Sequence, residues 1–140
     1  IEDLTVAELQ ANAASGDIDV KNVKASSSRI NSTSGDIKVQ NLEGSLDASG
    51  VSGEISVSGL KGDSLNSSST SGDIDLNDIT ANAVTGSTIS GDIKVKPADK
   101  AGWSVQMKTL SEDTRSKLAS GVSAAKKMVL SSTSGDIAVE

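Results

Sequence analysis

The sequence predicts an all-β fold, a parallel β-solenoid of about seven coils with a period near 19 residues. One phrase, Ser-Gly-Asp-Ile, recurs along the chain, and the glycines from Gly16 to Gly91 are separated by 19, 18, 19 and 19 residues. Aliphatic residues keep a fixed distance from each glycine, which a disordered low-complexity chain has no reason to do. The usual right-handed crossover between parallel strands favours a right-handed coil.

A short strand is expected directly after each repeated glycine. The glycines are Gly16, Gly35, Gly53, Gly72, Gly91 and Gly135, and two residues later stand Ile18, Ile37, Ile55, Ile74, Ile93 and Ile137. A second aliphatic residue follows each isoleucine by two positions, as Val39 follows Ile37. This alternation of apolar and polar residues is the period of a strand with one buried face.

A second alternating strand is expected to lead into each glycine. Leu46 and Ala48 lie seven and five residues before Gly53, and Leu42 supplies a third aliphatic position between the two strands. Units stacked in register about 4.8 Å apart would place identical residues over one another, so that each coil buries the face of its neighbour. Glycine at the corner tolerates positive φ and close backbone approach.

The long gap between Gly91 and Gly135 is interpreted as one further, decayed coil. The segment 109–114 resembles the repeated phrase, with Glu112 in the place of glycine and with Val105 and Met107 seven and five residues before it. Enlarged, irregular turns are therefore expected over 96–130. A hairpin or a short helix over 112–127 is the alternative.

The chain is interpreted as a single repeat domain spanning 1–140. Ile1 falls inside a coil and Glu140 stands just after one, so a fragment of a longer protein is expected, with targeting and anchoring sequences outside it. Trp103 is the only aromatic residue, in keeping with a narrow aliphatic interior. It is expected to cover the last coils, the alternative being insertion into a membrane interface or a partner.

Composition excludes several functional classes. Thirteen basic and nineteen acidic residues give a net charge of −6, and there is no basic stripe, so nucleic-acid binding is not expected. The absence of His and Cys excludes the common catalytic triads and zinc sites. No cofactor is expected, and the sequence contains no transmembrane run.

An acidic residue follows each repeated glycine. These residues are Asp17, Asp36, Glu54, Asp73, Asp92 and Asp136, with Asp113 in the decayed unit. Stacked like charges repel, and calcium is one ion that could offset them. The nonapeptide pattern of calcium-binding repeats is absent, however, and capping of backbone amides, helped by Lys38 and Lys94, is the preferred explanation.

Two further chemistries fit the sequence poorly. A polysaccharide-active enzyme needs a unique pair of carboxylates, whereas Asp63, Asp78 and Asp99 lie near turns where they would cap loops. Ice binding would need an unbroken threonine row. The row two residues before the glycines reads Ala14, Thr33, Val51, Thr70, Ile89 and Thr133. Only half of it is threonine.

Ser-Gly-Asp-Ile-x-Val at this period resembles the toast-rack, or adhesin-like, domains of bacterial envelope proteins. The resemblance covers residues 4–139 and departs from the pattern at Glu54 and at 112–114. It implies a non-enzymatic β-solenoid at the cell surface or beside membrane-associated stress-sensing modules, and it brings no set of catalytic residues.

We therefore expect a non-enzymatic module located outside the cell, at its surface or associated with the membrane. It would present flat repeat faces to an envelope polymer, a peptide or a protein, as an adhesin or an envelope-stress interaction domain. Membrane association would come only from flanking segments, and self-association is possible in principle for any stacked repeat. A structural spacer or self-assembling module is the alternative, and a polysaccharide-active enzyme a remote one.

Overall fold

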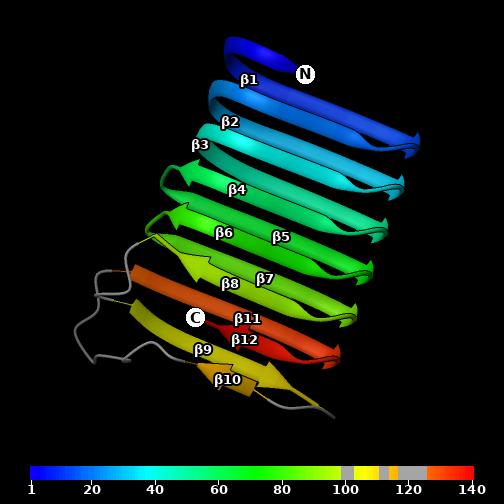
Figure 1. The fold of residues 1–140 in the computed structure, drawn as a ribbon, viewed down its shortest axis with the longest axis vertical. Coiled ribbons are helices and arrows are strands. Elements are labelled where there is room, and N and C mark those ends of the chain that lie inside the picture. Colours follow the sequence, from blue (N-terminus) through cyan, green and yellow to red (C-terminus); the bar gives the residue numbers. More distant parts are fainter. Residues whose placement is uncertain (99–102, 111–113, 117–125) are drawn as a thin grey trace.

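The computed structural model describes residues 1–98, 103–110, 114–116 and 126–140, and in them the chain forms a parallel β-solenoid without helices (Figure 1). The predicted fold is confirmed, with about six turns in place of the seven expected. The strands are β1 (Glu2–Ser15), β2 (Ile18–Ser34), β3 (Ile37–Ser52), β4 (Ile55–Lys61), β5 (Ser64–Ser71), β6 (Ile74–Thr80), β7 (Ala83–Ser90), β8 (Ile93–Pro97), β9 (Trp103–Thr109), β10 (Thr114–Ser116), β11 (Lys126–Ser134) and β12 (Ile137–Val139).

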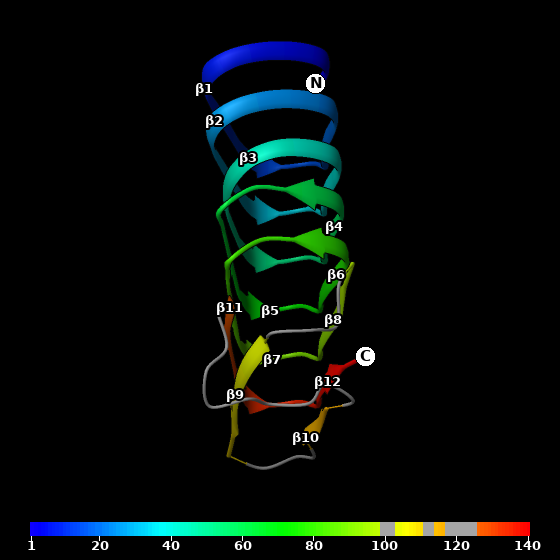
Figure 2. The same cartoon turned by 90° about the vertical axis from the view of Figure 1, so that its left-hand side faces the viewer.

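Each coil is a flattened loop with two walls (Figure 2). The first wall contains the residues after each repeated glycine, in β2, β3, β4, β6, β8, β12 and β10. The second wall contains the residues that lead into each glycine, in β1, β2, β3, β5, β7, β11 and β9. In β2 and β3 one long strand runs through both walls, whereas later coils are divided into two strands.

Matching aliphatic residues lie over one another inside the stack. Ile37 pairs in register with Ile55, and Ile55 with Ile74. All three side chains are buried, as is the third aliphatic row at the bend between the walls, for example Leu42. The expected ladder is therefore present, and it holds the coils together by burying apolar surface that no single coil could cover alone.

The glycine corner is tight for two reasons, as Gly53 illustrates. Its φ is +135°, and a Cβ atom there would lie 2.4 Å from the carbonyl oxygen of Gly35 in the preceding coil. Gly16 in the first coil also has a positive φ, +103°, but a Cβ would meet nothing within 4 Å. Each repeated glycine is thus required by its backbone conformation, and also by the neighbouring carbonyl wherever another glycine corner precedes it.

A second run of left-handed residues precedes the third aliphatic position and was not predicted. Asp3, Asn22 and Asn41 have φ values of 50°, 50° and 54°. The Asn41 side-chain amide donates to Asn22 Oδ1, and that of Asn22 donates to Asp3 Oδ1, both at 3.0 Å. Asn and Asp are the non-glycine residues that best tolerate this conformation, so their recurrence before Val23 and Leu42 was a readable signal.

The last two coils do not stack in sequence order. Strand β11 pairs with β7 on one side and with β9 on the other, so the coil 126–139 lies between the coils 83–97 and 103–116 (Figure 1). The Gly91 amide accordingly donates to the Ser134 carbonyl at 3.0 Å. The decayed unit does join the stack in the predicted register, since Val105 pairs with Met128 and Met107 with Leu130.

This order corrects the expectation that the decayed coil would follow Gly91 directly. An inner coil must match the tight corner on both sides, whereas the outermost coil has a neighbour on one side only, so a coil without the glycine is best tolerated at the end. In addition, Leu130 lies over the space left by Gly86, where an added Cβ would be 3.0 Å from Leu130 Cδ2. Coil 126–139 therefore complements β7 in shape.

Within 96–130, where enlarged turns were expected, the described residues include β9, β10 and the start of β11. The described part of 112–127 is strand, so the short-helix alternative finds no support there. Glu112, Asp113 and Asp99 lie outside the described residues. Trp103 begins β9, but the covering role expected of its side chain also lies outside what the structure describes.

Candidate functional site

The acidic residues after the glycines form one line along the stack, which we call the acidic corner. Its members are Asp17, Asp36, Glu54, Asp73, Asp92 and Asp136, all exposed or half-buried. Four of the five adjacent pairs in the stack are linked by a hydrogen bond from the backbone amide of one member to Oδ1 of the other. These bonds join Asp36 to Asp17 and Glu54 to Asp36 at 3.0 Å, and Asp92 to Asp73 and Asp136 to Asp92 at 2.9 Å.

The expected capping of corner amides is confirmed, with the detail that the carboxylate caps the neighbouring coil. A charged acceptor strengthens such a hydrogen bond, which offsets part of the repulsion between stacked carboxylates. The repeat phrase therefore has a local explanation: glycine permits the close corner, and the next residue ties adjacent coils together. Each carboxylate remains at the surface, where it also sets the local charge.

A hollow of about 220 Å³ opens beside the acidic corner. Four carboxylates, one ammonium group and one isoleucine line it: Glu54, Asp73, Asp75, Asp92, Lys94 and Ile74. Lys94 pairs in register with Asp75 on the first wall, so it lies next to an opposite charge. The remaining excess of carboxylates makes this hollow attractive to cationic groups and to hydrogen-bond donors.

The calcium alternative for the acidic corner gains no support. Among the described residues, no three His, Cys, Asp or Glu side chains are grouped so that they could hold a metal ion. The corner offers one carboxylate per coil at a spacing of about 4.8 Å. Calcium takes six to eight oxygen ligands at about 2.3–2.6 Å, a density that a single line of carboxylates does not supply.

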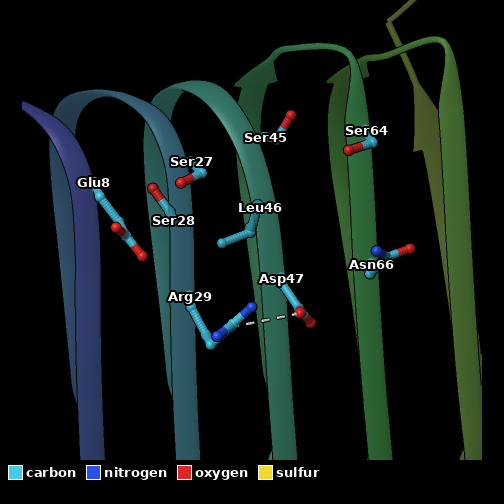
Figure 3. A pocket seen from close by; sticks show the side chains of 9 residues that line it. All are labelled: Glu8, Ser27, Ser28, Arg29, Ser45, Leu46, Asp47, Ser64 and Asn66. Carbon is cyan, nitrogen blue, oxygen red and sulfur yellow. Dashed lines mark ion pairs between the residues drawn. The ribbon is translucent and has the colours of Figure 1, made fainter.

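A second, smaller hollow of about 100 Å³ lies on the outer face of the second wall (Figure 3). The space is open because the serine side chains that line it are small. Glu8, Arg29 and Asp47 are the charged groups around it. Arg29 and Asp47 point toward one another from β2 and β3, with 3.9 Å between Arg29 Nε and Asp47 Oδ2. Both side chains are more than half exposed, so this ion pair contributes little to stability.

The remaining candidate acids do not converge on a reaction centre. Asp78 adopts a left-handed conformation with φ 52° before Ile79, and the Asp63 carboxylate accepts a hydrogen bond of 3.4 Å from the Asn82 side chain. Both therefore act in turns, as expected. In the described residues, no helix is long and apolar enough to cross a membrane.

Comparison with known proteins supports the structural reading. Neither the curated proteins nor the solved structures gave a match. The family model described as Toastrack DUF4097 matches residues 1–140, the whole chain. With the repeated glycine corner and the parallel stack described above, this match leads to a plain conclusion: the chain belongs to the Toastrack family, a family defined without a known function.

Proposed function

We propose that this protein is a non-enzymatic interaction module of the bacterial envelope or cell surface, and that it binds an extended cationic partner along the acidic corner. The observation that carries the proposal is the line of carboxylates, one per coil, four of which (Asp17, Asp36, Asp73 and Asp92) accept a hydrogen bond from a backbone amide of an adjacent coil. The partner would be a lysine- or arginine-rich peptide segment lying along the stack.

Binding of this kind depends on many weak contacts. An exposed ion pair is worth about 0–1 kcal/mol, so one corner carboxylate cannot hold a partner. Six of them in one line supply a useful affinity only together, and they also attract the partner over a distance of about 10 Å at 0.1 M salt. The net charge of −6 works in the same direction. Binding should therefore weaken steeply as salt rises.

The character of the surface hollows supports a non-enzymatic role. In the hollow of Figure 3, Asp47 is engaged with Arg29, and the other carboxylate, that of Glu8, lies on β1, two strands away from Asp47 on β3. In the hollow beside the acidic corner, Asp73 and Asp92 are equivalent members of one row, whereas acid and base catalysis needs two carboxylates in different environments. Turnover of a polysaccharide panel by the purified protein would contradict this part of the proposal.

The binding experiment uses a lysine-rich peptide of about ten residues, which in extended form spans roughly 33 Å. Calorimetric titration at low and high salt should give binding that is lost at high salt. The double variant Asp73→Asn and Asp92→Asn keeps the Oδ1 acceptors and removes two charges, so it should bind several-fold more weakly with little loss of stability. Asp47→Asn removes a charge on the second wall and serves as the control.

The acidic corner is not the binding site if the protein fails to bind the peptide at low salt, or if Asp47→Asn reduces binding as much as the double variant does.

The alternative role of a rigid spacer rests on the glycine corner, which fixes the geometry of successive coils. A spacer should bind no peptide and should behave as a long, stiff particle in solution scattering. Fractionation of cells that make the full-length protein would test the proposed location.

A further inference from the structure

One row of exposed side chains runs along the outer face of the second wall, two residues before each glycine position. In spatial order this outer stripe consists of Ala14, Thr33, Val51, Thr70, Ile89, Thr133 and Leu110. Val51, Ile89 and Leu110 are large aliphatic residues with 48%, 56% and 72% of their surface exposed. Aliphatic surface of this kind, repeated along one line, is a typical component of a protein–protein interface.

The stripe has a regular pattern only in the folded molecule. Because β11 lies between β7 and β9, Thr133 separates Ile89 from Leu110 (Figure 1). After Ala14, threonine and an aliphatic residue then alternate from coil to coil. In sequence order Leu110 would follow Ile89 directly and the alternation would be broken. The spatial order of the coils, and not their order in the sequence, therefore produces the complete alternation.

The rows on either side of the stripe are almost free of charge. The row at the glycine side is Ser15, Ser34, Ser52, Ser71, Ser90 and Ser134, and the row on the other side is Asn12, Asn31, Ser49, Ser68, Ser87, Ser131 and Lys108. Lys108, on the outermost coil, is the one charged residue in these rows, although 23% of the chain is charged. Depletion of charge is what distinguishes the centre of an interface from ordinary surface.

We infer that this face binds a second copy of the chain, with the two stacks antiparallel about a two-fold axis that runs along β5. Such an axis places Thr70 against its own counterpart and Val51 against the partner's Ile89. Ala14 meets the partner's Leu110, so the smallest stripe residue faces the largest exposed one. The stripe read backwards keeps aliphatic opposite aliphatic and threonine opposite threonine, which is the self-complementarity that a two-fold interface requires.

The charged residues of the second wall that lie farther from the stripe fit the same arrangement. Glu8 on β1 comes within one coil of the partner's Lys127, and Asp47 faces the partner's Thr85, so no two like charges stand directly opposite one another in these rows. A hollow of about 570 Å³, lined by the stripe residues Ala14, Thr33, Val51 and Thr70 and by neighbours that include Asn31 and Ser49, leaves room for water between the two sheets.

The area is sufficient for a stable dimer. With strands about 4.8 Å apart and a rise of about 3.3 Å per residue, the second wall measures roughly 29 by 25 Å. Two such faces would bury about 1,400 Å² together, which is within the range of specific protein–protein interfaces.

A single-cysteine variant tests the two-fold axis directly, because the chain has no cysteine of its own. Thr70→Cys should give a dimer cross-linked by a short bifunctional maleimide, since the two Thr70 positions meet on the axis and facing sheets lie about 10 Å apart. Ser58→Cys, also exposed but on the first wall, is the matched control and should stay monomeric. Equal cross-linking of both variants, or of neither, would overturn the proposed arrangement.

A charge-swap experiment tests the pairing of Val51 with the partner's Ile89. Analytical ultracentrifugation over a range of concentrations should show a dimer for the unaltered protein. Val51→Asp and Ile89→Lys should each raise the dissociation constant by at least about tenfold. The double variant should recover most of the loss, because each new carboxylate then meets a new ammonium group. Ser58→Asp is the control, and circular dichroism checks the fold of every variant.

A monomer at all concentrations, or a dimer that none of the stripe substitutions weakens, would contradict the inference. Loss of the dimer on altering β1 alone would point to end-to-end stacking and would equally contradict it. None of these variants alters the acidic corner, so the two proposals stand or fall separately.

Discussion

The Oδ1 atom of Asp73 accepts a hydrogen bond of 2.9 Å from the backbone amide of Asp92, one coil farther along the stack. The carboxylate thus serves an adjacent coil and not its own. Because the same bond recurs along the acidic corner, an acidic residue at this place acts as a link between coils as well as a surface charge. The two roles can be separated by substitution.

Substitutions of Asp73 should distinguish the hydrogen bond from the charge. Asp73→Ala removes the acceptor and should lower the free energy of unfolding by about 1.5–3 kcal/mol, the range for hydrogen bonds to charged groups, less the gain from relieved repulsion. Asp73→Asn keeps an acceptor oxygen and should cost clearly less. Urea unfolding of both variants gives the comparison. Equal costs would mean that the bond to Asp92 is unimportant.

Two glycine substitutions should separate backbone conformation from close approach. Gly16→Ala should cost about 1–2 kcal/mol, because only the positive φ is strained there. Gly53→Ala adds a contact of 2.4 Å with the Gly35 carbonyl oxygen and should cost several-fold more, or prevent folding. Thermal unfolding followed by circular dichroism measures both. Similar melting temperatures of the two variants would show that the coils can move apart without loss of stability.

The contact between Gly86 and Leu130 tests the stacking order of the last coils. Gly86→Ala should overpack this site and Leu130→Val should leave space, each at a cost of about 1 kcal/mol. Together they should cost less than the sum by at least about 0.5 kcal/mol, because the new methyl group occupies the space of the lost one. Strictly additive costs in urea unfolding would indicate that β11 does not pack on β7.

Asn22 combines a left-handed backbone with two side-chain hydrogen bonds. Asn22→Gly keeps the conformation and loses the bonds to Asp3 and Asn41, so it should cost about 1 kcal/mol. Asn22→Ala loses the two hydrogen bonds and also strains the left-handed backbone, so it should cost about 1–2 kcal/mol more than Asn22→Gly. Differential scanning calorimetry resolves this difference, and a smaller cost for alanine than for glycine would contradict the assigned role of φ.

The walls, the core and the corner could be predicted because each depends on residues at fixed distances from one glycine. Ile37, Ile55 and Ile74 can be recognised as one row in the sequence because each stands two residues after a repeated glycine. The same reasoning gave the register of Val105 and Met107, since both are set by local alternation. It also gave the capping role of the acidic residues, although not the coil that they cap.

The order of the last coils could not be read in this way. Val105 and Met107 fit the second wall of any coil, and only contacts between distant residues, such as Gly86 with Leu130, determine which coil lies next to which. The place of Leu110 in the outer stripe, after Thr133 and not after Ile89, was hidden for the same reason. The hydroxyl of Ser28, in the row that otherwise contains Leu9 and Leu46, is buried without a hydrogen-bond partner in the described structure, which the repeat pattern did not predict.

Since β11 separates β7 from β9, a segment made late in translation comes to lie between two made earlier. While the ribosome is still adding residues 126–139, coil 103–116 has no permanent neighbour, and the edge of β7 stays open to whatever strand reaches it first. Completion of the stack therefore waits for the last part of this segment, and a nascent chain that stops short of it exposes an unpaired edge that chaperones and proteases can recognise.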